Sequence, residues 1–163
     1  ILGSLVIVFF YILLRFQKWQ FSLGAVSAVF HDVLIVLGIF SLTYKIMPFN
    51  MEINQAFIAA LLTVIGYSLN DTVVVFDRIR EFFKIHSSWN SETTVNTALN
   101  STLSRTLNTS LTTLIVLIAI FIFGGESIRG FMFALIIGVM VGTYSSVFIA
   151  TPIMFDSYKN KSN

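Results

Sequence analysis

Ionisable and amide side chains interrupt three long apolar stretches of this chain. His31-Asp32 lies in the second apolar stretch, Asn70-Asp71 in the third and Arg105 in the fourth. A charge near the centre of a bilayer costs at least ~2.5 kcal/mol, so such residues usually face other helices or water and often belong to proton or ion pathways. A carboxyl group that gains and loses a proton opposite a guanidinium is therefore the chemistry that these residue types favour.

Helical spacing gathers polar residues into one stripe on the third stretch and one on the fourth. Hydroxyl and amide groups in a membrane pair across helix interfaces or line wet cavities. We therefore expect the two stripes to face each other or a shared cavity. The predicted stripes consist of Thr63, Gly66, Tyr67, Asn70 and Asp71 on the third stretch, and of Ser101, Arg105, Asn108 and Thr112 on the fourth.

The ionisable residues are predicted to lie at one depth. Counted from the ends of their apolar stretches, at 1.5 Å per residue, Asp71 lies ~10 Å and Arg105 ~13 Å from the same membrane edge. His31 and Asp32 lie ~12 to 14 Å from that edge. A short connection keeps the third and fourth helices adjacent, so the sequence predicts that Asp71 and Arg105 lie within reach of each other.

Two interpretations of Asp71 and Arg105 remain open from the residues alone. They could form a buried ion pair that fixes helix register and never titrates. Alternatively, Asp71 could carry protons, and its protonation would change which helix packing is preferred. His31 likewise could relay protons or could simply hydrogen-bond to Asp32 or to a carbonyl group.

Composition places these residues in a membrane protein. Of the 163 residues, 56% are hydrophobic and 11% are charged, against about 25% charged in soluble domains. Backbone groups in lipid must be satisfied internally, and the apolar runs are too long for barrel strands, so we predict helices. The expected fold is an all-α bundle of five spans within a membrane domain of residues 1–158, followed by a tail at 159–163. The predicted spans are 1–14, 23–47, 53–77, 96–123 and 130–153.

Basic residues predict the orientation of the spans. They favour alternate connections, which places the first and third connections and the tail on the cytoplasmic side. The chain begins inside an apolar run without a leader, which suggests a piece of a longer protein. The residues that set this orientation are Arg15, Lys18, Arg78, Arg80, Lys84, Lys159 and Lys161.

Small residues recur every fourth position in the last span. Such a stripe permits close helix contact, so we interpret it as a packing feature. Its members are Gly130, Ala134, Gly138, Gly142, Ser146 and Ala150.

Several classes of function find no support in the sequence. A net charge of +2 is too small to indicate nucleic-acid binding, and the chain has no cysteine. It contains no phosphate-binding loop, metal-ligand cluster or nucleophile-base arrangement. We expect neither an enzyme nor a cofactor.

The run from Gly66 to Glu81, GYSLNDTVVVFDRIRE, resembles the signature of the SecD/SecF family of protein-export membrane subunits. The segments SRTLNTSLTT at 104–113 and GGESIRGF at 124–131, together with His31-Asp32, resemble the same family in the same order. The similarity is to the SecF branch, within the resistance-nodulation-division superfamily, and covers essentially the whole chain.

This resemblance implies the second to sixth spans of a six-span subunit in the bacterial inner membrane, without its first span and periplasmic domain. It implies a complex with SecD that uses the proton motive force to promote export through the SecY/SecE/SecG channel. YidC, YajC, the exported polypeptide and membrane lipid are the other implied partners. By motif position, the family's proton-path acid and its basic partner fall on Asp71 and Arg105, with Asn70, His31, Asp32 and Asn108 beside them. A related proton-coupled transporter of a lipid or small hydrophobic molecule and a passive assembly scaffold remain as alternatives.

Overall fold

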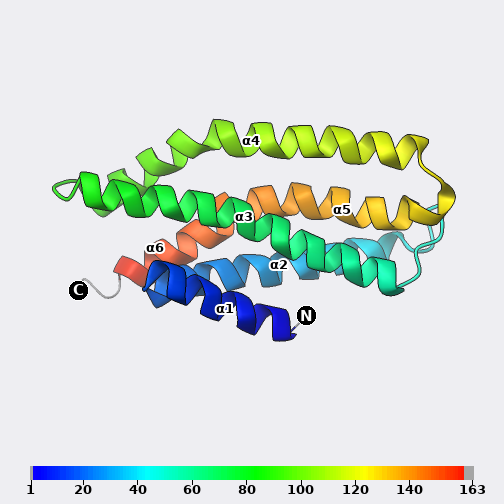
Figure 1. The fold of residues 1–163 in the computed structure, drawn as a ribbon, viewed down its shortest axis with the longest axis horizontal. Helices are drawn as coiled ribbons and strands as arrows, with labels where there is room; N and C mark the ends of the chain where they lie inside the picture. The colour runs from blue at the N-terminus through cyan, green and yellow to red at the C-terminus, as the bar shows by residue number, and fades with distance from the viewer. Residues whose placement is uncertain (1, 160–163) are drawn as a thin grey trace.

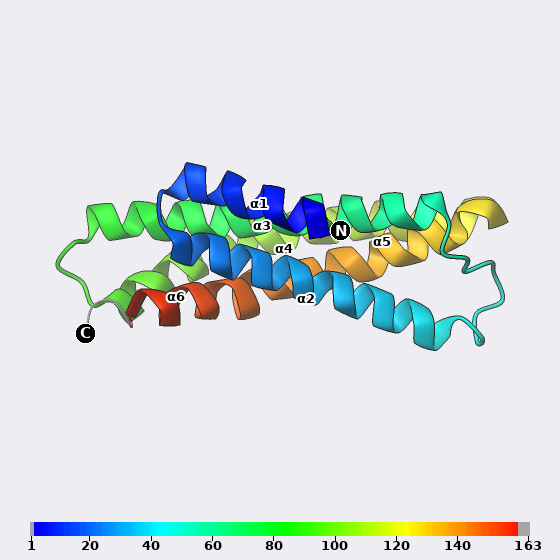
Figure 2. The same ribbon diagram turned by 90° about the horizontal axis from the view of Figure 1, so that it is seen from below.

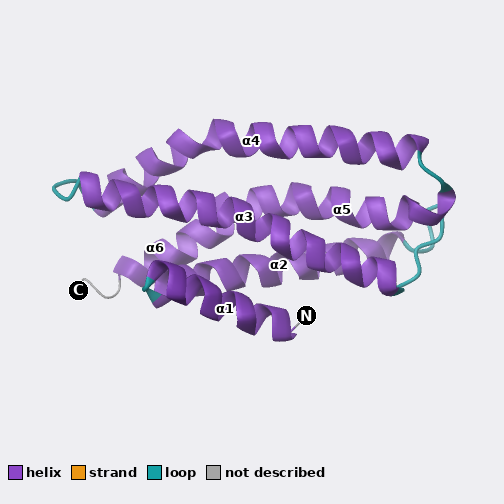
Figure 3. Cartoon of the chain, viewed as in Figure 1, coloured by secondary structure: helices purple, strands orange, loops and turns teal. Residues whose placement is uncertain are grey.

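The chain folds into long helices joined by short connections (Figure 1). The computed structural model describes residues 2–159, and Figure 3 shows helices and loops but no strand within that range. Ile1 and most of the predicted tail, residues 160–163, lie outside the described residues. The elements are α1 (Leu2–Phe16), α2 (Trp19–Thr43), α3 (Gln55–Ile85), α4 (Ser91–Phe123), α5 (Glu126–Ser145), the π-helix η1 (Ser146–Ala150) and α6 (Thr151–Lys159).

Four helical segments of the described chain have the length and apolarity needed to cross a membrane. They are α2, α3, α4 and the continuous segment Glu126–Lys159 that comprises α5, η1 and α6. Helix α1 is apolar but has 15 residues, or about 22 Å, which is shorter than a roughly 30 Å hydrocarbon core. The all-helical prediction is therefore confirmed, and four of the five predicted spans have membrane length.

The two ends of the bundle differ in which connections they carry. The α1–α2 and α3–α4 connections and the end of α6 lie at one end, which we call the basic end because Arg15, Lys18 and Lys84 lie there (Figures 1 and 2). The α2–α3 and α4–α5 connections lie at the opposite end. Helix α1 runs from the middle of the bundle to the basic end.

The helices extend further than the predicted spans. Arg78, Arg80 and Lys84, expected in a connection, lie in the last turns of α3, and Glu126 and Arg129 lie in the first turn of α5. The apolar residues end near the edge of the hydrocarbon layer, but the helical backbone hydrogen bonds continue through the charged residues beyond it. Hydropathy therefore predicted the span and not the full helix.

Charged residues attach α1 to α3 at the basic end. Arg15 and Asp77 form an ion pair at 2.5 Å, and the Arg80 guanidinium donates to the Arg15 carbonyl oxygen at 3.2 Å. Helix α1 ends because Gln17 adopts a left-handed conformation, with φ 55°, a common helix-terminating geometry. The chain then turns directly into α2.

The small-residue stripe brings α5 against α3, so its predicted packing role is confirmed. A Cβ atom added at Gly138 would overlap Val64 of α3, and one added at Gly142 would lie 3.1 Å from the Cβ atom of Ser68. Gly142 and Gly138 are buried, as are Ala134 and Ser146. The two helices approach more closely than larger side chains would permit.

A π-helix interrupts the last span at Ser146–Ala150. Pro152 lies two residues later and has no N–H to donate to the carbonyl group four residues earlier, which disfavours a regular α-helix here. The Thr151 hydroxyl donates to the Ser146 carbonyl oxygen at 3.0 Å. The sequence analysis treated 130–153 as one uninterrupted span and missed this irregularity.

The apolar core is divided into two clusters along the bundle. One, towards the basic end, includes Phe16, Phe76 and Ile79. The other, towards the opposite end, includes Phe40 and Phe57, whose ring centroids are 4.2 Å apart. Buried polar residues lie between the two clusters.

We predict that Gly138→Ala destabilises the subunit by about 1–3 kcal/mol, the usual cost of overpacking. The new Cβ atom would lie 2.9 Å from the Cβ atom of Val64, so a rotamer change of Val64 alone cannot relieve the overlap. Thermal unfolding of the intact subunit in detergent would measure the effect. Val64→Ala should partly rescue the variant.

The matched control is Gly38→Ala in α2, where no atom lies within 4 Å of the added Cβ. Alanine has the higher helix propensity, so this control should be neutral or slightly stabilising. Equal melting temperatures for the two variants would contradict the close-packing account.

Candidate functional site

Asp32 of α2 is fully buried, with 0% of its surface exposed, and is held by three side chains. Its Oδ2 atom accepts hydrogen bonds from the Ser68 hydroxyl of α3 at 2.5 Å and from the Ser145 hydroxyl of α5 at 2.7 Å. Its Oδ1 atom lies 3.1 Å from Nδ1 of His31. One carboxylate thus connects α2, α3 and α5 between the two apolar clusters.

His31 links this buried carboxylate to the outside of the chain. Its side chain is 33% exposed, whereas that of Asp32 is 1% exposed. The contact with Asp32 confirms the hydrogen-bonding interpretation of His31. A relay role would use the same contact and stays a prediction.

Asp71 of α3 is the second buried carboxylate, with 4% of its surface exposed. Its Oδ2 atom has no hydrogen-bond partner among residues 2–159. Ser110 and Arg105, both from α4, lie near this carboxyl group. Asp71 therefore differs from Asp32 in having an unsatisfied oxygen.

A hydroxyl network from three helices adjoins Asp71. The Tyr67 hydroxyl donates to Ser110 Oγ at 3.2 Å, and Ser110 shares a hydrogen bond of 2.5 Å with Thr143 of α5. The polar layer thus continues from Asp32 across α3 to α4. Both buried acids lie within it.

Arg105 does not form the direct ion pair with Asp71 that one of the two interpretations required. Across the described chain, no carboxylate oxygen lies within 4.0 Å of its guanidinium. Arg105 instead lines a groove of about 350 Å³ between α3 and α4, together with Asp77 and Glu81.

The structure also corrects the predicted face of α4. The buried polar residues of this helix are Thr94, Thr102, Thr106 and Ser110. The predicted stripe of Ser101, Arg105, Asn108 and Thr112 is exposed instead, although Ser101 and Arg105 line the groove that α4 forms with α3. Polar residues surround α4 on nearly all sides over this stretch, so periodicity alone could not identify the packed face.

The α3 stripe is divided in the same way. Asp71 is buried and Tyr67 is partly buried, whereas Thr63, Gly66 and Asn70 are exposed. Asn70 and Asn108 therefore do not join the buried network that contains Asp71. Together with Arg105 they give α3 and α4 an exposed polar edge, which we call the α3–α4 polar edge.

Sequence reasoning missed the hydroxyl groups that complete the site. These are Ser68, Ser145, Ser110 and Thr143. The available signal was the run Thr143-Tyr144-Ser145-Ser146 within an apolar span. The small residues of that span had been interpreted only as packing residues, so this signal was missed.

The described residues offer no metal centre, because no group of three or more His, Asp or Glu side chains within 2–159 is placed to hold an ion. The arrangement has carboxylates, hydroxyls, one imidazole and one guanidinium. Such groups can bind, hold and transfer protons.

Comparison with known proteins identifies the family. Residues 1–160 match the family described as "Protein export membrane protein SecD/SecF, C-terminal". The chain belongs to the SecD/SecF family. Within that family it is 60% identical to the protein translocase subunit SecF of Rhodothermus marinus over 156 residues, which cover 96% of this chain and 50% of that protein. It is 50% identical to SecF of Cereibacter sphaeroides, covering 88% of this chain and 42% of that protein.

A solved structure of the SecD/SecF family has the same fold. The crystal structure of SecDF in a super-membrane-facing form matches with a TM-score of 0.85 and 41% identity. The match covers 99% of this chain and 21% of that one. The chain thus spans about half the length of the SecF relatives it matches, and its long apolar helices are those of a multi-pass membrane protein.

We predict that Ser145→Ala lowers the free energy of unfolding by about 1–2 kcal/mol, because Asp32 loses one of its buried donors. Thermal unfolding of the intact subunit would detect the change. Ser146→Ala is the matched control, since Ser146 is equally buried but its hydroxyl donates within its own helix, to the Thr143 carbonyl at 2.9 Å. Equal melting temperatures for the two variants would show that the Ser145–Asp32 hydrogen bond contributes no more to stability than the local hydrogen bond of Ser146.

Proposed function

We propose that this chain is the membrane portion of a subunit that works with SecD and uses the proton motive force to promote protein translocation through the Sec channel. Family membership supports the role in Sec-dependent export. The observation that carries the proton-coupled part is Asp71, a buried carboxyl group within a membrane-length helix that has an unpartnered oxygen.

Asp71 is better suited than Asp32 to exchange protons during a cycle. Both acids are buried, but three side chains hold Asp32, two of them through Oδ2. Changing the charge of Asp32 would disturb contacts among three helices. Asp71 can change its charge with a smaller loss of hydrogen bonds, so we assign it as the proton carrier and Asp32 as its neighbour in the pathway.

Arg105 supplies the response to that charge. The Arg105 guanidinium is attracted to an ionised Asp71 and is released into the groove between α3 and α4 when Asp71 is neutral. Such a change would shift α4 relative to α3. One elementary charge crossing 100 mV releases ~2.3 kcal/mol, enough to bias a two-state equilibrium about fiftyfold.

The proposed partners follow from the α3–α4 polar edge and from the family. Arg105, Asn70 and Asn108 are exposed on membrane-length helices, where contact with lipid tails would be costly. We propose that the membrane helices of SecD cover this edge in the bacterial inner membrane. In that setting α1 acts as a fifth membrane helix, and SecY/SecE/SecG, YidC, YajC and the exported polypeptide are the wider partners.

Asp71→Asn in the complete subunit is expected to abolish the proton-driven stage of export without reducing assembly with SecD. Asparagine has nearly the same shape but cannot exchange a proton. The measurement is translocation of a preprotein into membrane vesicles with and without a proton gradient. Asp156→Asn, at an exposed acid of α6, should leave export unchanged, and normal gradient-driven export by Asp71→Asn would refute the assignment.

Arg105→Gln should reduce proton flux at least tenfold in liposomes that contain the SecD/SecF complex, because the charge-sensitive partner of Asp71 is lost. A pH-sensitive dye inside the vesicles provides the readout. A passive scaffold predicts the same flux for wild type and variant, so this comparison separates the proton-coupled subunit from the scaffold.

A further inference from the structure

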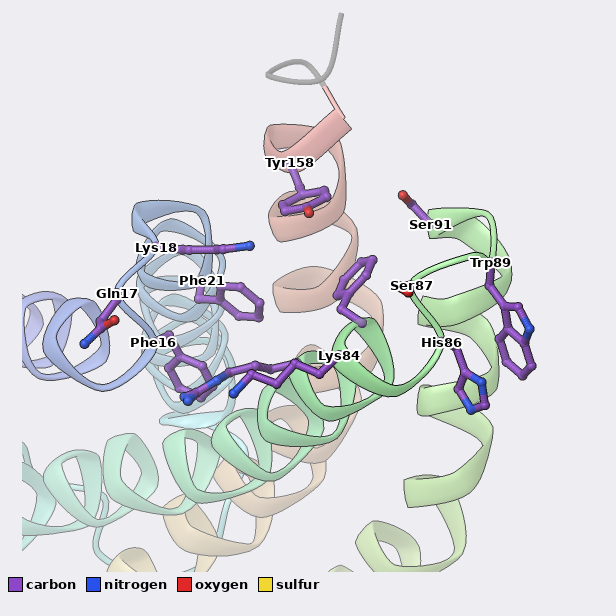
Figure 4. A pocket seen from close by; sticks show the side chains of 12 residues that line it. Phe16, Gln17, Lys18, Phe21, Lys84, His86, Ser87, Trp89, Ser91 and Tyr158 are labelled. Atoms are coloured by element: carbon purple, nitrogen blue, oxygen red, sulfur yellow. The ribbon is translucent and has the colours of Figure 1, made fainter.

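A pocket of about 530 Å³ opens at the basic end of the bundle, away from both buried acids. It lies between the α1–α2 connection, the last turns of α3 and the end of α6, as Figure 4 shows. Lys18 and Tyr158 extend into the same space from opposite sides, and the Lys84 side chain runs from α3 towards Phe16 (Figure 4).

The pocket carries an excess of positive charge. Lys18, Arg80 and Lys84 line it, and its lining includes no acidic side chain among the described residues. None of these three cations forms an ion pair with a carboxylate within residues 2–159. Two acids on the neighbouring turns of α3 are already engaged, because Asp77 pairs with Arg15 and Glu81 pairs with Arg78.

Aromatic groups and the backbone hold two of the cations in place. The Lys18 ammonium lies 4.8 Å from the centre of the Tyr158 ring. Arg80 donates to the Arg15 carbonyl and lies 5.9 Å from the centre of the Phe16 ring. Three positive charges thus converge on one opening, and none of them is paired with a carboxylate in the part of the chain that the structure describes.

The surroundings of the pocket are those of a membrane interface. Trp19 follows Lys18 directly and is 47% exposed, and Trp89, which lines the pocket, is 42% exposed. Exposed tryptophan is typical of the headgroup zone. The walls formed by Phe16 and Phe21 are apolar, and exposed apolar residues such as Phe10 and Leu14 continue along α1 from the pocket.

We propose that this pocket binds the phosphate of an anionic phospholipid of the phosphatidylglycerol class, with acyl chains lying along α1. Basic pockets between membrane helices on the cytoplasmic side are suited to such headgroups. An acidic peptide would match the charge but not the apolar path beside it. A bound lipid would join α1, α3 and α6 at the end where the chain has its longest helical extensions.

The test uses the complete subunit in its complex with SecD, reconstituted in nanodiscs of phosphatidylglycerol and phosphatidylcholine. Lipids retained after extraction are counted by native mass spectrometry. Lys18→Gln with Lys84→Gln should weaken retention of phosphatidylglycerol about 25-fold, at about fivefold per basic residue, and leave phosphatidylcholine unchanged. Lys18→Arg with Lys84→Arg should retain the preference, as should Lys45→Gln, an exposed lysine at the opposite end.

Three results would overturn the proposal. The first is equal retention of phosphatidylglycerol by wild type and the double glutamine variant. The second is displacement by inorganic phosphate as effective as displacement by a short-chain phosphatidylglycerol, which would mean that the pocket recognises free phosphate. The third is displacement by a soluble polyglutamate peptide at lower concentration than by the lipid, which would favour a protein partner. Each is independent of proton flux through Asp71.

Discussion

The buried carboxylate of Asp32 is the interaction on which the arrangement of the bundle depends. A charge inside an apolar core is tolerated only when neighbouring groups satisfy it, and here the hydroxyls come from two other helices. Those hydroxyls reach Asp32 because α5 lies close to α3 along its small residues. Gly142 faces Ser68 itself, so close packing and hydrogen bonding are two parts of one constraint.

The two buried acids differ in the number of partners they have, which is the basis for the different roles proposed for them. Asp32 is saturated and connects three helices, while Asp71, one turn along α3 from Ser68, has an oxygen without a donor. A bundle that changes shape needs a fixed region and a region that can change charge at low cost. Ser68, which donates to Asp32, lies on the same helix as Asp71, so a change at Asp71 would be coupled to the contact that Asp32 makes with α3.

The sequence predicted the features of the fold and the site that depend on hydropathy and on residue type. Apolar runs gave the approximate positions of the four long helices and of the shorter α1, which had been predicted as a fifth span. The cost of charge in lipid singled out Asp32 and Asp71, which are both buried. It could not predict which side of α4 packs, because Ser101, Thr102, Arg105 and Thr106 offer polar groups in every direction. It also could not predict Ser145 as a ligand of Asp32, since that contact joins residues 113 positions apart and depends on the tertiary approach of α5.

The π-helix explains how the last span packs against two different helices. Gly138, Gly142 and Ser145 of α5 face α3 and Asp32, whereas Ala150 and Met154 pack against Gly24 of α2. In a regular α-helix, the residues after Ser145 would continue the face that packs against α3. The turn at Ser146–Ala150 is wider than an α-helical turn by one residue, which rotates the face presented by the residues that follow it. Pro152 favours this wider turn, and the hydrogen bond from the Thr151 hydroxyl to the Ser146 carbonyl oxygen stabilises it. Ser145 can therefore point at Asp32, and Ala150 can still contact α2. The Ala150 carbonyl oxygen would lie 2.5 Å from a Cβ atom added at Gly24.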